Sequence, residues 1–163
     1  VELRFANVML DPAERAGLNL FACSHLTPGP IRRQAWLRHP NGAVAIAGLT
    51  VLADDVEPLA AFATRLLGSA AVTRTDRVVA MQTGSCPVML ATPDDAALLH
   101  PGFALPQEAP EPSLAVMEIA VTEPDATARF LDRQGVGYDR DSDGAVLVAP
   151  AEASGVHLAF VAA

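Results

Sequence analysis

One pattern of apolar and polar positions occurs twice along the chain, over residues 48–68 and 116–135. Each segment begins with an apolar run, passes through an acidic turn and continues with apolar residues at helical spacing up to a glycine. A proline falls in the first turn of each expected helix, where its missing amide hydrogen is tolerated. The pattern therefore predicts two outer helices, over residues 56–67 and 124–134.

Polar side chains in front of each expected helix can accept hydrogen bonds from its free backbone amides. Asp54 or Asp55 is expected to do so before the first helix, and Thr122 before the second. Three short strands follow each helix, at residues 70–75, 77–83 and 86–92 in the first case and at residues 136–140, 145–150 and 155–161 in the second. The stretch DSDG, residues 141–144, is typical of a hairpin turn.

This repeat divides the chain into four parts. Residues 44–92 and 113–163 are expected to form two strand–helix–three-strand units, joined by a proline-rich linker over residues 93–112 that begins with a helical turn. Residues 1–43 contain two expected strands and an irregular connection. We interpret these residues as the remnant of a preceding unit. Because the first residue is a valine inside an expected strand, we also expect the chain to be a fragment.

The last expected strand has two different faces, because successive side chains of a strand point to opposite sides. Val156, Leu158 and Phe160 share one face, which is expected to pack under a helix. His157 and Ala159 share the other face. We expect this second face to look into a cavity.

Three stretches of the chain resemble one protein superfamily: residues 21–55, 58–68 and 146–161. They are similar to the vicinal oxygen chelate superfamily, which includes glyoxalase I, bleomycin-resistance proteins and extradiol dioxygenases, and most of all to bacterial glyoxalase-like domain proteins. The resemblance implies an α+β fold in which tandem βαβββ units pair into a half-open curved-sheet barrel around a cavity. The resemblance says little about the reaction or the ligand, because one fold hosts many functions.

Enzymes of that superfamily hold a divalent metal in the cavity, with His or Glu ligands on the first and last strands of each unit. The positions that match are Gly48, Val116 and Ala159, and a place near Met89. None of these side chains offers the carboxylate or imidazole that Mg, Mn, Fe or Zn requires. We therefore predict no metal site and no cofactor; a divalent metal held by displaced ligands is the alternative.

Two ionisable residues are expected on the cavity side of the sheet, Glu118 and His157. If they are paired, they could bind a ligand or move a proton, and they are the candidate catalytic residues. The alternative is that both are partly solvated residues at the rim.

A polar connection precedes the first unit and contains Trp36, Arg38 and His39. It is interpreted either as a flap that binds a ligand, with Trp36 stacking on it and an arginine holding an anionic group, or as a structural clasp. Thr50, on the cavity face of its strand, and Met89 complete the candidate ligand-binding residues.

The composition excludes several classes of partner. Hydrophobic residues make up 51% and the formal net charge is −8, which argues for a globular protein without a nucleic-acid or membrane partner. No signal peptide or membrane-spanning run is present. Cys23 and Cys86 fit no metal or disulfide pattern, so reduced thiols in the cytoplasm are expected.

Two functions from different classes remain open. The first is a small-molecule-binding protein that uses no metal. The second is a lyase or isomerase that uses Glu118 and His157, or an enzyme with a displaced metal. A homodimer is expected in either case, because the strand over residues 1–10 exposes an edge that must pair or be covered.

Overall fold

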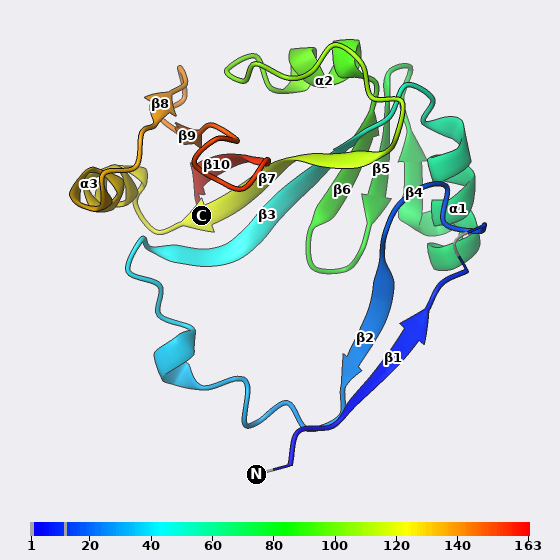
Figure 1. Ribbon diagram of the computed structural model, residues 1–163, viewed down its shortest axis with the longest axis horizontal. Coiled ribbons are helices and arrows are strands. Elements are labelled where there is room, and N and C mark those ends of the chain that lie inside the picture. Colours follow the sequence, from blue (N-terminus) through cyan, green and yellow to red (C-terminus); the bar gives the residue numbers. More distant parts are fainter. Residues whose placement is uncertain (1, 12) are drawn as a thin grey trace.

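The structure is a computed structural model that describes residues 2–11 and 13–163. Its main element is a curved sheet with the strand order β4-β5-β6-β3-β7-β10-β9-β8 (Figure 1). The first unit supplies β3 (Ala43–Leu52), β4 (Val72–Arg74), β5 (Val78–Gln82) and β6 (Pro87–Ala91). The second unit supplies β7 (Ser113–Val121), β8 (Asp139–Arg140), β9 (Val146–Val148) and β10 (His157–Ala162).

The two units meet at their first strands, because β3 and β7 pair antiparallel in the middle of the sheet. Within each unit the first and last strands are parallel neighbours, β3 with β6 and β7 with β10. The helices α1 (Glu57–Leu67) and α3 (Pro124–Gln134) lie at opposite ends of the sheet, each against its own unit (Figure 1). The predicted α+β fold, with tandem βαβββ units in a curved and unclosed sheet, is confirmed.

The last strand has the two faces that its alternation predicts. Phe160 is buried against Ala128 and Leu131 of α3. Ala159 points to the other side, where it packs against Leu147. Burial of a large apolar side chain such as that of Phe160 contributes about 1.5–3 kcal/mol, which holds β10 under the helix.

The start of each outer helix differs from the prediction in detail. The N-cap residue of α1 is Val56, and Asp55 accepts a hydrogen bond from the amide of the first helical residue at 2.9 Å. The prediction that Thr122 caps the second helix is wrong, because the N-cap of α3 is Glu123 and its side chain makes no capping bond. The amide of Thr122 instead donates to the carbonyl of Gly42, which ties this residue to the start of β3.

A third helix, α2 (Pro93–Leu99), opens the segment between the two units. Thr92 caps it by accepting the amide hydrogen of Asp95. The helix lies across one side of the sheet in Figure 1, and Ala96 packs there with Leu52 and Val116. None of the helices in the described part of the chain is long and apolar enough to cross a membrane.

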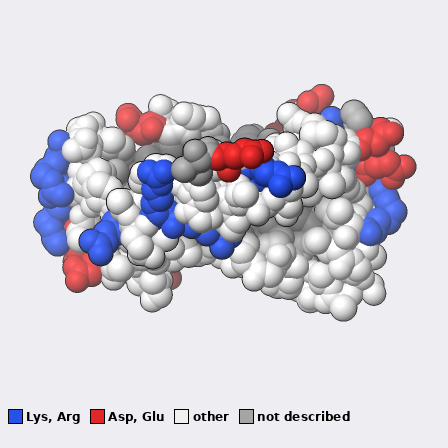
Figure 2. Space-filling view, turned by 90° about the horizontal axis from the view of Figure 1, so that it is seen from below, with Lys and Arg blue, Asp and Glu red and all other residues white. Residues whose placement is uncertain are grey.

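Residues 2–42 form what we call the N-terminal arm. It contains an antiparallel pair of strands, β1 (Phe5–Met9) and β2 (Phe21–His25), and a single 3-10 turn, η1 (Gln34–Trp36). Both strands are exposed along their whole length, and the pair stands away from the main sheet (Figure 1). Seen from below, the face that carries the arm shows broad uncharged areas between scattered charged groups (Figure 2). Val1, where the expected edge strand begins, lies outside the described residues.

Candidate functional site

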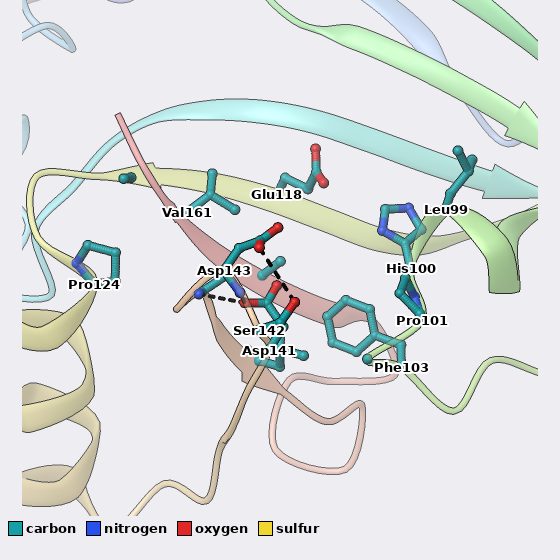
Figure 3. A pocket seen from close by; sticks show the side chains of 15 residues that line it. Leu99, His100, Pro101, Phe103, Glu118, Pro124, Asp141, Ser142, Asp143 and Val161 are labelled. Carbon is teal, nitrogen blue, oxygen red and sulfur yellow. Dashed lines mark hydrogen bonds between the residues drawn. The ribbon is translucent and has the colours of Figure 1, made fainter.

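A pocket of about 460 Å³ lies beside β7 and β10, on the face of the sheet to which Glu118 and Ala159 point. We call it the central pocket. Its walls come from four places: the loop after α2, the strands β7 and β10, the turn between β8 and β9, and the start of α3 at Pro124 (Figure 3). The lining includes residues 99–103 and 141–143, with Glu118, Ala145, Leu147, Ala159 and Val161.

Glu118 is the ionisable residue at the centre of the pocket wall. It is part-buried in the middle of β7, beside Ala159 on the neighbouring strand. Its carboxylate lies over the backbone of β3 at Gly48, where an added Cβ would be 2.5 Å from Oε2. Within residues 2–11 and 13–163 this carboxylate has no hydrogen-bond or ion-pair partner (Figure 3). A carboxylate in such a position is free to bind a ligand.

His100 is a second ionisable residue of the pocket, and sequence reasoning missed it. It follows α2, and its Nε2 shares a hydrogen bond of 2.8 Å with Oγ1 of Thr50. Burial lowers the pKa of the His100 imidazole, and the attraction of Glu118 opposes this shift. The prediction that Thr50 faces the cavity side pointed to this place, but nothing in the local pattern brings the end of the linker helix to it.

His157 lies on the expected face of β10 but does not line the central pocket. It is 7% exposed, and its ring contacts that of Phe103 with 4.5 Å between centroids. Its Nε2 lies 3.3 Å from the carbonyl oxygen of Ala104. A carbonyl only accepts, so Nε2 carries the hydrogen and Nδ1 is a bare acceptor, without a partner among the described residues. Phe103 thus lines the central pocket and contacts His157, which does not line it.

The turn between β8 and β9 brings further carboxylates to the pocket. Oδ1 of Asp141 accepts the amide hydrogens of Asp143 and Ala145 at 3.0 and 2.8 Å, which fixes the turn. The predicted hairpin turn is thus present, and it places Asp141, Ser142 and Asp143 on the pocket wall (Figure 3). The sequence pattern predicts only a turn for residues 141–144, so the place of this turn in the site was not predicted.

The remaining predicted ligand-binding residues lie elsewhere. Trp36 is 55% exposed on η1, with the guanidinium of Arg33 stacked 4.7 Å from its ring. His39 lines a shallow groove on the other part of the sheet, next to Val44 and Ile46. Arg38 also belongs to the exposed connection. The structure does not bring these arm residues to the central pocket.

Met89 and Thr50 lie opposite each other on paired strands, β6 and β3. Thr50 is buried and reaches His100, as described above. Met89 does not line the central pocket. Thr50 therefore belongs to the site through its hydrogen bond to His100.

The side chains at the superfamily's metal positions do not fit a metal. Gly48 has no side chain, Val116 is fully buried in an apolar cluster, and Ala159 offers only a methyl group. The described residues contain no group of three or more His, Cys, Asp or Glu side chains that could hold a metal ion. Metal-free binding stays a prediction, which metal analysis of the purified protein would test.

Comparisons with known proteins find similar solved structures at low sequence identity. No protein-family model matches the chain, and no curated protein matches its sequence. Among solved structures, a methylmalonyl-CoA epimerase from Mycobacterium tuberculosis is 16% identical, covers 77% of this chain and 91% of its own, and has a TM-score of 0.49. A homoprotocatechuate 2,3-dioxygenase variant from B. fuscum is 15% identical to this chain and has a TM-score of 0.49. The match covers 72% of this chain and 32% of the dioxygenase chain.

A third similar structure is a Streptomyces coelicolor methylmalonyl-CoA epimerase variant in complex with 2-nitronate-propionyl-CoA. It is 15% identical, with a TM-score of 0.47 over 74% of this chain and 95% of that one. The epimerases and the dioxygenase are members of the vicinal oxygen chelate superfamily. The chain described here has two βαβββ units joined through their first strands. Likeness at these identities says nothing about activity.

The buried imidazole of His157 and the part-buried imidazole of His100 predict how stability depends on pH. Burial lowers the pKa of His100 and of His157, so the unfolded chain binds protons at a higher pH than the folded chain. Stability is then intact above about pH 6.5 and falls as the pH drops below it, by about 1.4 kcal/mol for each full unit of pKa depression. Urea unfolding of His100→Gln and His157→Gln should show a flatter profile between about pH 7 and pH 5. His39→Gln, which removes an exposed imidazole, is the control and should keep the wild-type profile.

Gly48 should be energetically coupled to Glu118. In Gly48→Ala the new methyl group displaces the Glu118 carboxylate, and this cost offsets the usual gain of about 0.5–1 kcal/mol from replacing a strand glycine. In a Glu118→Ala background the same substitution should give that gain in full. Thermal unfolding of both single variants and the double variant measures the coupling. Additive effects would mean that the carboxylate does not rest on Gly48.

Proposed function

We propose that this protein binds a small organic molecule in the central pocket, without the divalent metal of its superfamily. The observation that carries the proposal is the Glu118 carboxylate, which faces the pocket without a partner among the described residues. A polar group held in this way costs free energy unless a ligand or water satisfies it.

The form of the pocket supports the same proposal. Its volume of about 460 Å³ lies within the ~300–1,000 Å³ that small-molecule sites occupy. Apolar side chains such as Phe103, Leu147 and Val161 alternate with a few polar groups that converge on the space. Such a lining buries the body of an organic ligand and fixes its orientation.

An isomerase or lyase that transfers protons is the second candidate. The observation that favours it is that Glu118 and a histidine line one pocket and that Glu118 attracts the charged form of this histidine, so two groups capable of proton transfer face the same space. That histidine is His100, because His100 lines the central pocket and His157 does not. In this proposal Thr50 holds the His100 ring through the bond to Nε2. Deuterium exchange into a bound ligand would favour the enzyme over the binder.

A fragment screen by ligand-observed NMR tests the binding proposal. Val161→Trp fills the central pocket and is expected to abolish binding of every fragment that the wild-type protein takes there. Val44→Trp is the matched control, since Val44 is exposed on another part of the sheet, and it should leave binding unchanged. Fragments that bind both variants equally, or no bound fragment at all, would overturn the proposal.

We also propose a homodimer. Phe5, Val8, Met9 and Phe21 are exposed on the two strands of the N-terminal arm, and an isolated two-stranded sheet is marginally stable in water. Sedimentation should give twice the chain mass of 17.0 kDa. A clean monomer would contradict the proposal.

Domain organisation and location remain proposals from the sequence. We propose that residues 1–43 belong to a preceding unit of the same kind, and that the protein is bacterial and cytoplasmic. Cys23 and Cys86 are free thiols, which supports a reducing compartment.

A further inference from the structure

The lining of the central pocket is negatively charged. Glu118, Asp141 and Asp143 contribute carboxylates from two different elements, β7 and the β8–β9 turn. No lysine or arginine lies among the described residues that line the pocket. His100 adds little opposing charge at neutral pH, because burial lowers its pKa. The pocket therefore presents a negative potential to whatever enters it.

The arginines that form ion pairs in the described part of the chain are engaged elsewhere. Their pairs are Arg65 with Glu14, Arg74 with Glu57, Arg77 with Asp95 and Arg140 with Asp125, and none of these residues lines the central pocket. Even Arg140, which directly precedes the acidic turn, directs its guanidinium to Asp125 at 2.7 Å. The pocket carboxylates are thus left without a neighbouring positive charge from the lining.

The three carboxylates differ in how far the protein satisfies them. Asp143 accepts a long hydrogen bond of 3.5 Å from the neighbouring hydroxyl of Ser142. Asp141 accepts two backbone amides, so its role is to hold the turn. Glu118 has no such bond within the described residues, although it is part-buried in the middle of the sheet. Desolvation disfavours a charged carboxylate, and a nearby cation reverses this. Glu118 is therefore the residue whose free energy a positively charged ligand would lower most.

An aromatic ring faces the same space. Phe103 lines the pocket together with Glu118 and lies beside His100 (Figure 3). Its ring also contacts that of His157. The face of an aromatic ring attracts cations, and its surface also packs against apolar groups. A carboxylate and an aromatic ring in one pocket suit a molecule that is both organic and positively charged.

We propose that the central pocket takes an organic cation, a protonated amine or quaternary ammonium group placed next to Glu118, with its apolar part against Phe103 and Val161. This inference rests on the proposed binding function and names the charge class of the ligand. The inference also excludes anionic ligands, because the carboxylates of the lining would repel a ligand carboxylate or phosphate.

Three probes of similar shape and different charge test the inference: benzylammonium, benzyl alcohol and benzoate. Protein-observed NMR titration should give the lowest dissociation constant for benzylammonium and one at least about tenfold higher for benzoate, with benzyl alcohol between them. High salt should reduce the difference. Glu118→Gln should remove most of the advantage of the cation. Glu152→Gln removes an exposed carboxylate outside the pocket and should leave the advantage unchanged.

The outcomes separate this inference from the proposed function. Equal affinity for the three probes, or tighter binding of benzoate, would overturn the charge class while the pocket remains a binding site. Failure of benzylammonium to bind a protein that takes other fragments in the central pocket would overturn it as well. If no fragment of any charge binds, the proposed function and the inference fall together.

Discussion

Leu52→Ala is expected to lower the free energy of unfolding by about 2–5 kcal/mol, the cost of deleting a fully buried leucine side chain. Leu52 is 0% exposed at the end of β3 and packs with Ala91, Ala96 and Val116. These neighbours come from β6, α2 and β7, so they cannot all close onto the space that the substitution leaves. Urea unfolding of the wild type and the variant measures the loss.

The same substitution should weaken ligand binding. Leu52 packs under α2, and Phe103 is partly buried against the same cluster. His100 follows α2 directly, so a less firmly packed helix leaves His100 and Phe103 of the pocket wall less well ordered. Leu98→Ala is the matched control, because this leucine of α2 is 66% exposed and its loss should cost less than about 0.5 kcal/mol. A loss below about 1 kcal/mol for Leu52→Ala would show that α2 is not held by this cluster.

Strand alternation was enough to predict which face of β10 packs under a helix, and helical spacing predicted the two outer helices. Phe160 lies under α3 and Ala159 on the pocket side, as the period of two requires. The two outer helices were predicted to within one residue, because each carries an apolar stripe and ends at a glycine. Apolar periodicity and helix-ending glycines are local features of the chain, so they can be found in a single sequence.

The composition of the site could be predicted only in part, because it depends on which loops cover the face. Glu118 could be placed, since it belongs to a strand whose face is fixed by its neighbours. His100 and the turn with Asp143 are carried to the pocket by connections whose paths have no periodic signal. For the same reason Phe103 could not be foreseen as the residue that contacts His157.

The arm residues show the opposite error. Trp36, Arg38 and His39 form a dense polar group in the sequence, and such density suggested a flap over the cavity. The connection instead runs along another side of the molecule (Figure 1). There the guanidinium of Arg33 stacks on the ring of Trp36. A high density of polar and aromatic side chains in one segment does not determine where that segment lies in the fold. The place of a segment is set by the strands at its two ends, here β2 and β3.

Glu118→Ala is expected to leave the fold intact and to change ligand binding more than it changes the melting temperature. The Glu118 carboxylate makes no hydrogen bond or ion pair with the described residues, so its removal deletes no polar interaction that holds the sheet. It also relieves the cost of keeping a charge part-buried. The free energy of unfolding should therefore change by less than about 1 kcal/mol. Binding of benzylammonium should weaken at least about tenfold, because the counter-charge for the ligand is lost.

Glu57→Ala provides the control for this prediction. Glu57 pairs with Arg74 at 2.6 Å on the surface of the first unit, away from the central pocket. Its loss removes an exposed ion pair, which contributes little to stability, and should leave benzylammonium binding unchanged. If Glu118→Ala unfolds the protein while Glu57→Ala does not, the carboxylate of Glu118 is a structural group of the sheet. If instead both variants bind the probe like the wild type, the ligand does not reach Glu118, because a charge in contact with a bound cation cannot be removed without a change in affinity.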